Sequence, residues 1–357
     1  MTVNESNKLK LLWFDHSFHK KTKSTNFLRE ILEKKFNVSI FWDDYWKGEE
    51  PLPVSEINNY DYVFFFQTLL PFYKLKQIKA KIIWVPMFDG NHLSDRYWYC
   101  LSSIPIKILS FSEYLHKKCL EFNIESLPLK YYLPPAFSDA IPKTGRHYFF
   151  WYRGSLRFSE IKSIIDPQMV DSFVYRSAPD PYFKEETFSK EDIEKYKLQI
   201  IRDVTFDSRE KYLELLKKSN IYIAPRTIEG IGISFLEAMA IGMVVVAYNN
   251  GTMNEYIKHD YNGYLFDSKD YHINFDNMET VLNNSKAMAQ NGWIKWEKDK
   301  NIISSFIMNN NYKQTQISDT YFFLYSTLQR LEINLRRAVK RKIIKVTGFI
   351  KTILLNF

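Results

Sequence analysis

Two glutamates with seven residues between them, Glu229 and Glu237, flank a loop that contains glycine. Gly230 and Gly232 let the backbone pass close to a ligand without obstruction from side chains. A helix that begins near Ser234 would direct its free N–H groups and the positive end of its dipole at that ligand. The segment therefore predicts a binding site for a diphosphate group.

The same segment argues against a dinucleotide site and offers a second explanation for one glutamate. A dinucleotide fingerprint requires a third glycine where Phe235 stands, so a Rossmann dehydrogenase is excluded. Ser234 and Glu237 match the S-x-x-E capping box, which would explain Glu237 without any substrate. Glu229 has no such local role, and a carboxylate beside this loop is suited to binding sugar hydroxyls. Gly242 is expected to end the helix in a left-handed conformation.

Alternating apolar and polar stretches around this segment predict two α/β domains. The first series contains the runs KLLWF, VSIFW, DYVFFF, KIIWVP and IKILSF, and the second contains HYFFWY, DSFVY, QIIRDV, NIYIAP and MVVVAY. The proline-containing stretch Leu133 to Gly145 separates the two series and is typical of a linker. We therefore expect two Rossmann-like, doubly wound domains that face each other across a cleft.

The expected domain boundaries follow from these runs and from the length of 357 residues. That length exceeds what one hydrophobic core usually accommodates, so two domains of about 150–200 residues each are expected. We expect a first domain over 1–142 and a second over 143–306. We expect a helical segment over 307–329 next, and one alternative is that this segment crosses back to the first domain. The remaining residues, 330–357, form an amphipathic tail.

The composition describes a folded chain in a reducing compartment. Hydrophobic residues make up 45% of the chain, and its two cysteines, Cys100 and Cys119, cannot form a disulfide framework or a zinc site by themselves. The start MTVNESNKLK lacks the apolar core of a signal peptide. No apolar stretch reaches the length of about 18 residues that a membrane-spanning helix needs. These features predict a cytoplasmic protein.

The positive charge of the chain is concentrated in its last residues. The net charge is +8, and the segment from Arg330 to Phe357 holds eight basic residues and one acidic residue, which leaves +1 for the rest. A body without basic excess argues against nucleic-acid binding. The apolar residues of the tail recur at helical spacing and are Leu335, Val339, Ile343, Val346, Ile350, Ile353 and Phe357.

A basic amphipathic helix of this kind predicts attachment to an anionic membrane surface, here the inner face of the cytoplasmic membrane. Two alternatives remain open from the pattern itself. The helix could pack on the body or on a partner chain, or it could bind nucleic acid.

The stretch EGIGISFLEAMAIG resembles the E-x7-E signature of the family 4 glycosyltransferases, and NNGTMNEYI and HDYNGYLF are similar to that family's downstream pattern. The resemblance implies the GT-B fold and a sugar transfer that retains anomeric configuration, without a metal or other cofactor. It also implies that Glu229 contacts the donor sugar and Glu237 the ribose. The backbone at Gly232, Ile233 and Ser234 would hold the diphosphate.

The resemblance also implies a basic pair after the first strand of the second domain, but the sequence there, YRGSLRFSEIK, departs from the family pattern. Arg153 and Arg157 are our candidates for neutralising the diphosphate leaving group, with Lys162 a weaker one. A cluster of solvated residues at a helix start is the structural alternative. Arg226 is a candidate for a third cation. Val204 and Thr205, in the stretch RDVTF, lie where relatives contact the base.

The first domain is expected to bind the acceptor. Its polar residues at strand ends are Asp15, His16, Gln67, Asp89 and His92. Asp89 and His92 follow a strand that is apolar throughout, and Asp89 is the candidate that would orient an acceptor hydroxyl. His16 and His92 are weaker acceptor candidates, because strand-end residues often serve only a loop or a helix cap. No cluster with the spacing of metal ligands occurs in the sequence.

These observations predict a glycosyltransferase that moves a sugar from a nucleoside diphosphate sugar to a glycan or a lipid-linked acceptor. The resemblance implies a role in surface polysaccharide assembly, such as capsule or lipopolysaccharide O-chain. Two other functions remain open. One is a nucleotide-sugar epimerase of the same shape, and the other is a scaffold that binds nucleotide sugars without catalysis.

Overall fold

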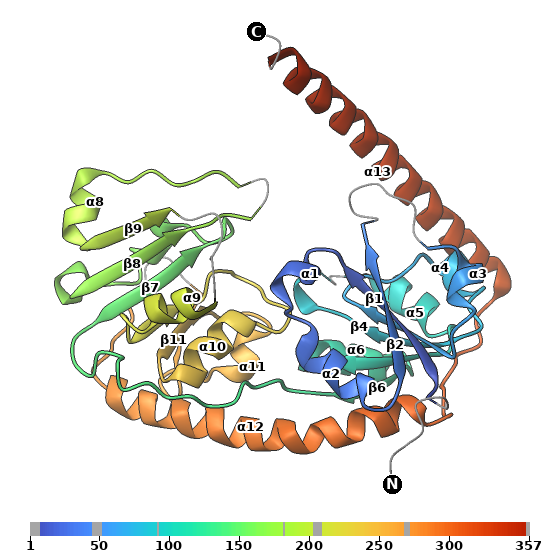
Figure 1. The fold of residues 1–357 in the computed structure, drawn as a ribbon, viewed down its shortest axis with the longest axis horizontal. Helices are drawn as coiled ribbons and strands as arrows, with labels where there is room; N and C mark the ends of the chain where they lie inside the picture. Colours follow the sequence, from blue (N-terminus) through green and yellow to red (C-terminus); the bar gives the residue numbers. More distant parts are fainter. Residues whose placement is uncertain are drawn as a thin grey trace.

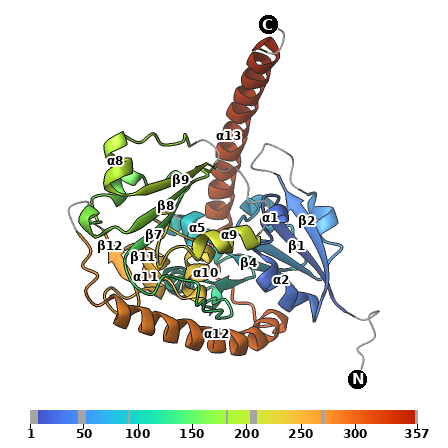
Figure 2. The same cartoon turned by 60° about the vertical axis from the view of Figure 1, so that its left-hand side comes forward.

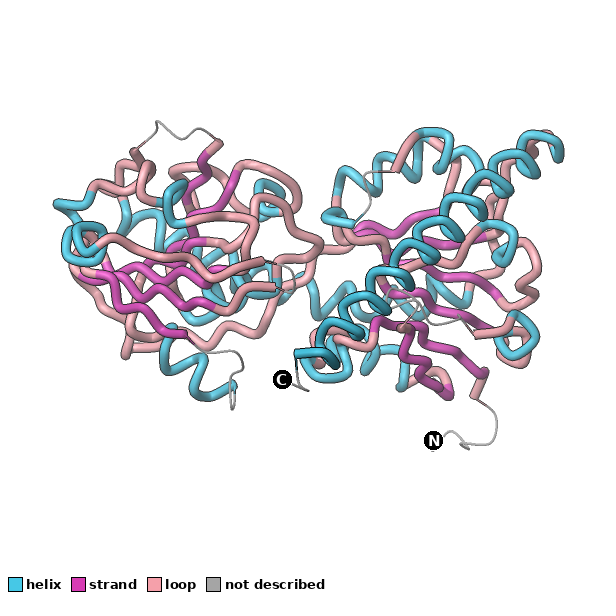
Figure 3. The backbone as a smooth tube through the Cα atoms, turned by 90° about the horizontal axis from the view of Figure 1, so that it is seen from above, coloured by secondary structure: helices cyan, strands magenta, loops and turns pink. Residues whose placement is uncertain are grey.

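The computed structural model describes residues 8–44, 52–90, 93–180, 183–202, 209–267 and 272–354, with side chains described as far as 339. Figure 1 shows two α/β bodies joined along one side by a long helix. Seen from above, each body holds its own sheet, and the two lie side by side (Figure 3).

The first domain is built on a parallel sheet of six described strands in the order β2-β1-β3-β4-β5-β6. The strands are β1 Lys10–His16, β2 Asn37–Asp43, β3 Tyr62–Phe66, β4 Lys81–Val85, β5 Ile106–Ser110 and β6 Glu125–Pro128. Its helices are α1 His19–Thr22, α2 Asn26–Glu33, α3 Val54–Ile57, α4 Phe72–Leu75, α5 Asp95–Leu101 and α6 Glu113–Glu121, with a 3₁₀ turn at Phe88–Gly90. β3 and β5 are buried along their whole length because helices cover both faces of the sheet.

The second domain repeats this architecture with the strand order β12-β11-β10-β7-β8-β9. The strands are β7 His147–Tyr152, β8 Ser172–Ser177, β9 Leu198–Arg202, β10 Ile221–Ile223, β11 Val244–Tyr248 and β12 Tyr264–Phe266. Its helices are α7 Phe158–Ile161, α8 Lys190–Lys195, α9 Arg209–Leu216, α10 Ile233–Ile241 and α11 Met253–Tyr256, with a 3₁₀ turn at Pro167–Met169. Each of the ten predicted runs overlaps a described strand. The polar edge strand β6 and the three-residue β12 lack a comparable apolar run.

Each sheet has a switch point where the strand order reverses, between β1 and β3 in the first and between β7 and β10 in the second. Ligands of doubly wound sheets bind beyond the carboxyl ends of the strands at such points. The loops after β7 and β10 carry Arg153, Arg226 and Glu229. The predicted α/β class with two doubly wound domains is therefore confirmed.

Helix α12, Met278–Met308, runs beneath both domains (Figure 1). It contacts α10 and β11 of the second domain and α2 of the first. Trp296 is buried against the rings of Phe27, Phe111 and Tyr131, all in the first domain. The expected boundary at 306/307 thus falls near the end of a helix that has already returned to the first domain.

The end of α12 is fixed by a buried lysine. The Lys107 ammonium group donates to the carbonyl oxygens of Phe306 and Asn309, each at 2.6 Å. A cation at this place satisfies carbonyl groups that the helix leaves without partners and meets the negative end of its dipole. The following residues lie along the first domain, where the Thr315 N–H donates to the Ser102 carbonyl at 2.8 Å.

Helix α13, Asp319–Leu354, starts on the first domain and then projects away from both bodies, as Figures 1 and 2 show. Phe322 and Ser326 are buried against the body, and the Gln329 side chain accepts a hydrogen bond from the Phe72 N–H at the start of α4 at 2.9 Å. Within the described residues, no helix is both long and apolar enough to cross a membrane.

Candidate functional site

The loop after β4 in the first domain lies directly against two loops of the second. A Cβ added at Gly230 would stand 2.9 Å from the Met87 sulfur and 3.0 Å from Asp89 Oδ1. A Cβ at Gly251 would stand 2.5 Å from the Phe88 ring. A side chain at either position would therefore press against the first domain, because the two domains meet there with little room.

Two arginines and two carboxylates form a charged cluster at this meeting point. Asp180 Oδ1 accepts hydrogen bonds from Arg153 Nε at 3.0 Å and from Arg153 Nη2 at 2.5 Å. Its other oxygen, Oδ2, accepts from Arg226 Nη2 at 2.5 Å. Arg226 Nη1 also lies 3.6 Å from Asp89 Oδ2 of the first domain. Predicted candidates from both domains, Arg153, Arg226 and Asp89, are thus brought together.

Glu229 lies within the electrostatic range of this cluster. Its side chain is almost wholly buried, with 9% of the residue exposed, and its N–H donates to the Gly251 carbonyl at 3.0 Å. Burial raises the pKa of Glu229 to about 7; Arg226 and Arg153 oppose this rise, while Asp89 and Asp180 add to it. A carboxyl group with this pKa is partly protonated near neutral pH.

The glycine loop leads into α10, as predicted, but the helix starts differently from the capping-box alternative. Gly232 is the N-cap, with a left-handed φ of 77°, and no side chain caps the helix. Ser234 lies inside the first turn, so a Ser234–Glu237 capping box is not formed. Ile233 begins the helix, and its early N–H groups are the expected diphosphate donors. Gly242 ends the helix with a φ of 96°, which confirms its predicted role.

Glu237 has an ionic partner that the sequence pattern did not indicate. Its carboxylate pairs with Nη2 of Arg209, at the start of α9, at 2.9 Å. Burial raises the pKa of Glu237, and Arg209 opposes this rise. The side chain therefore remains a candidate for a substrate contact, because the mostly exposed Arg209 can exchange its carboxylate partner for solvent.

Arg157 and Lys162 lie beside the same sheet edge but make other interactions. Arg157 is the exposed N-cap of α7, where its N–H donates to Glu160 Oε2 at 2.9 Å. Lys162 pairs with Asp192 at 3.0 Å. Among the described residues, no hydrogen bond or ion pair joins either side chain to Asp180. The cluster contains instead Arg226, which was expected only as a third cation.

The carboxylate that bridges the two arginines, Asp180, was absent from the predicted site residues. It follows β8, the neighbour of β7 in the sheet, so the rule that places ligands beyond strand ends applies to it equally. The polar stretch after the apolar run DSFVY was the signal that could have identified it. The ion pairs of Asp180 with the two arginines depend on which strands are neighbours in the sheet. The spacing of residues along the chain does not indicate that order.

Of the two candidate acceptor histidines, His16 lies among the described residues and His92 does not. His16 ends β1, where its ring Nδ1 accepts from the Phe18 N–H at 3.1 Å. The neighbouring Asp15 is fully buried, and its carboxylate accepts from Trp13 and Thr25 and contacts the His19 ring. These contacts shape the loop after β1. His92, Val204 and Thr205 lie outside the described residues.

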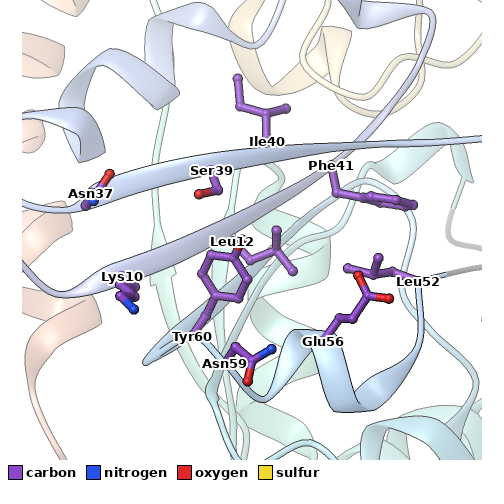
Figure 4. Close-up of a pocket in the computed structure, with 10 residues that line it drawn as sticks. All are labelled: Lys10, Leu12, Asn37, Ser39, Ile40, Phe41, Leu52, Glu56, Asn59 and Tyr60. Atoms are coloured by element: carbon purple, nitrogen blue, oxygen red, sulfur yellow. The ribbon is translucent and has the colours of Figure 1, made fainter.

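A pocket of about 440 Å³ lies elsewhere, between β1, β2 and α3 of the first domain (Figure 4). Lys10, Asn37 and Ser39 line it from the amino-terminal and middle parts of their strands, whereas the charged cluster lies at carboxyl ends. In the part of the chain that the structure describes, no group of three His, Cys, Asp or Glu side chains could hold a metal ion.

The sequence was compared with family models and with curated proteins. Residues 184–294, which include α10 and its glycine loop, match the family model of the group 1 glycosyl transferases. The chain is a glycosyltransferase. A search of curated proteins gives no significant match.

Several solved structures have a similar fold. HepE from Anabaena, solved with UDP, has a TM-score of 0.54 at 12% identity, covering 83% of this chain and 100% of its own. A glycosyltransferase from Rickettsia africae ESF-5 has a TM-score of 0.53 at 12% identity, covering 85% and 100%. Sucrose-phosphate synthase from Thermosynechococcus elongatus has a TM-score of 0.51 at 9% identity, covering 84% and 96%. These matches show that the glycosyltransferase has the GT-B fold.

Proposed function

We propose that this glycosyltransferase transfers a sugar from a nucleoside diphosphate sugar to a glycan or lipid-linked acceptor, with retention of configuration. The observation that carries the proposal is the convergence of Arg153, Arg226 and Glu229 beside the left-handed Gly232 that starts α10. The solved structure of HepE with UDP supports the donor class. The resemblance to family 4 supports retention and a role in surface polysaccharide assembly.

The donor diphosphate would bind at the N-terminus of α10, where the N–H groups of Ile233 and Ser234 have no helical partner. Arg153 and Arg226 would stabilise the negative charge that grows on the departing diphosphate. Burial of these groups between domains strengthens such interactions, because less water screens them. Arg157 would assist from the start of α7.

Glu229 would bind hydroxyl groups of the donor sugar, because its carboxyl group faces the same cluster. Glu237 would bind the ribose by exchanging its pairing with Arg209, and Val204 and Thr205 would contact the base. Asp89, on the loop of the first domain that touches Gly230, would orient the acceptor hydroxyl. His16 and His92 are the weaker acceptor candidates.

The first test measures thermal stabilisation by UDP, GDP, CDP, ADP and dTDP. A ligand at about 100 times its dissociation constant adds about 2.7 kcal/mol to the stability of the native state. A selective shift in melting temperature with one nucleotide would identify the donor class. The absence of a shift with every nucleotide would contradict the proposal.

The second test uses the donor identified in this way. Glu229→Ala should abolish sugar transfer while the fold is kept. Conversion of the donor without acceptor would indicate an epimerase.

The tail over 330–357 is the proposed contact with an anionic membrane on the cytoplasmic side. Exposed apolar side chains recur along the described part of α13. They are Phe323, Leu324, Leu328, Leu331, Leu335 and Val339. Arg330, Arg336 and Arg337 lie on the same helix. The net charge of +7 in the tail favours an anionic lipid surface over a second copy, because two such helices would repel each other.

Vesicle binding tests this contact. Leu331→Glu should weaken binding to vesicles that contain phosphatidylglycerol, because it places a negative charge on the exposed apolar face. Leu120→Glu is the matched control, since Leu120 is 55% exposed on α6 and Leu331 is 60% exposed. Equal binding of both variants and the wild type would contradict the contact. Self-association of the wild type that Leu331→Glu abolishes would assign the face to a second copy.

A further inference from the structure

Asp180 lies between two cations that would otherwise repel each other. Its two carboxylate oxygens accept from different arginines, Oδ1 from Arg153 and Oδ2 from Arg226. The Asp180 N–H also donates to the Arg153 carbonyl at 3.0 Å, so its loop is tied to the loop after β7. Three neighbouring strands, β8, β7 and β10, thus end in one bridged set of charges.

The bridge determines how the guanidinium groups are oriented. Arg153 uses its Nε–H and one Nη2–H for Asp180, and neither of these bonds involves its Nη1 donors. Its guanidinium group also lies 4.9 Å from the centroid of the Trp151 ring, which limits its rotation. Arg226 uses Nη2 for Asp180, while its Nη1 lies 3.6 Å from Asp89 Oδ2. Because one carboxylate holds both guanidinium groups, their remaining N–H donors lie close together and are suited to binding one anion.

We infer that Asp180 is a positioning residue that holds Arg153 and Arg226 together for binding the diphosphate group of the donor. The inference rests on the proposed function in one respect, namely that the bound anion is a diphosphate. Asp180 does not contact the diphosphate itself, since a carboxylate would repel it. Its effect is transmitted through the two guanidinium groups.

Inorganic pyrophosphate is a suitable probe because it carries the diphosphate without base, ribose or sugar. Isothermal titration calorimetry would compare the wild type with Asp180→Asn at constant ionic strength. We expect about tenfold weaker binding in Asp180→Asn, because the amide places an N–H₂ group against one guanidinium group and the arginines separate. Removal of a negative charge alone would strengthen anion binding. Weaker pyrophosphate binding by Asp180→Asn would therefore indicate a positioning role, and stronger binding would indicate a simple effect of charge.

Matched variants make the test specific. Glu33→Gln removes the same charge from an ion pair with Arg29 on α2 and should leave pyrophosphate binding unchanged. Asp180→Glu keeps the charge and should recover part of the lost affinity. In an Arg226→Gln background the effect of Asp180→Asn should shrink, because residues that act together are not additive. Melting temperatures would exclude loss of the fold. If Asp180→Asn does not fold, Asp180→Glu carries the test by itself: it should bind pyrophosphate more weakly than the wild type although the charge is unchanged, and equal binding would overturn the inference.

Equal or tighter pyrophosphate binding by Asp180→Asn would overturn the inference, as would a fully additive double variant. A wild-type protein that binds a nucleotide but not pyrophosphate would overturn the assignment of this cluster to the diphosphate while leaving the proposed function intact. Failure of the proposed function is seen separately, as the absence of stabilisation by every nucleotide in the panel.

Discussion

At the scale of single residues, the site depends on Glu229, a carboxyl group enclosed where the two domains meet. Burial is the main reason that its pKa is raised from 4.5 to about 7, and Arg226 limits the rise. A partly protonated carboxyl group can both accept hydrogen bonds from sugar hydroxyls and donate one to them. The charge of the cluster around Arg153 and Asp180 therefore changes near neutral pH.

This pKa predicts a pH-dependent stability. Between about pH 4.5 and 7 native Glu229 keeps a proton that the unfolded chain has lost. The stability from this proton is full below pH 4.5 and is lost as pH rises through about 7. Glu229→Gln stays neutral, so at about pH 8 it should be more stable than the wild type by up to about 3 kcal/mol. Near pH 4 the two should differ little. Urea unfolding at both pH values measures this, and parallel pH profiles would contradict it.

At the scale of elements, the start of α10 depends on a backbone conformation. Gly232 has a φ of 77°, which L-residues with a side chain rarely adopt, and an added Cβ would stand 1.9 Å from the Phe235 ring. Phe235 is fully buried in the core, so its ring cannot move aside without loss of packing. The direction of the N–H groups at the helix start therefore depends on glycine.

Gly232→Ala should lower the free energy of unfolding by more than about 2 kcal/mol, through the left-handed backbone and the clash with the buried ring. Gly90→Ala is the control, because no heavy atom lies within 4 Å of an added Cβ there. The control should change stability by less than about 1 kcal/mol. Urea unfolding of both variants measures the difference, and a similar small effect in both would show that α10 can start with another residue.

At the scale of the whole molecule, a carboxylate of one domain caps a helix of the other. Glu255 on α11 accepts from the Ser112 hydroxyl at 2.9 Å and from the Glu113 N–H at 2.8 Å, at the start of α6. Beside it the Tyr131 N–H donates to the Tyr256 hydroxyl at 3.1 Å. Together with α12, these contacts hold the loop after β4 against the glycine loop of the second domain.

Glu255→Ala should lower the free energy of unfolding by about 1–2 kcal/mol, because the first N–H groups of α6 lose a charged partner. It should also increase hydrogen exchange at the start of α6, since the two domains separate more easily there. Glu297→Ala is a control, because that glutamate pairs with Lys300 on the same helix, α12, and is on neither side of the α11–α6 contact. Equal exchange at α6 in the two variants would show that the cap does not restrain the domains.

Some features could be predicted from the sequence because they are local. The buried strands β3, β4 and β10 appear as apolar runs, since a strand covered on both faces needs apolar residues throughout. Gly242 indicates the helix end, because the left-handed conformation selects glycine within a few residues. The loop from Glu229 to Glu237 is likewise continuous in the chain, so its glycines and the helix that follows them could be predicted from the sequence.

The bridged cluster was decided by tertiary structure. Arg153, Asp180 and Arg226 are far apart in the chain, and they meet only because β8, β7 and β10 are neighbours in the sheet. Asp89 joins them because α12 and Glu255 hold the two domains together. Local sequence patterns record burial and backbone conformation over a few residues, whereas ion pairs of this kind follow from strand order and domain placement. The sequence by itself therefore determined the elements and the glycine loop, and the tertiary structure decided which charges surround that loop.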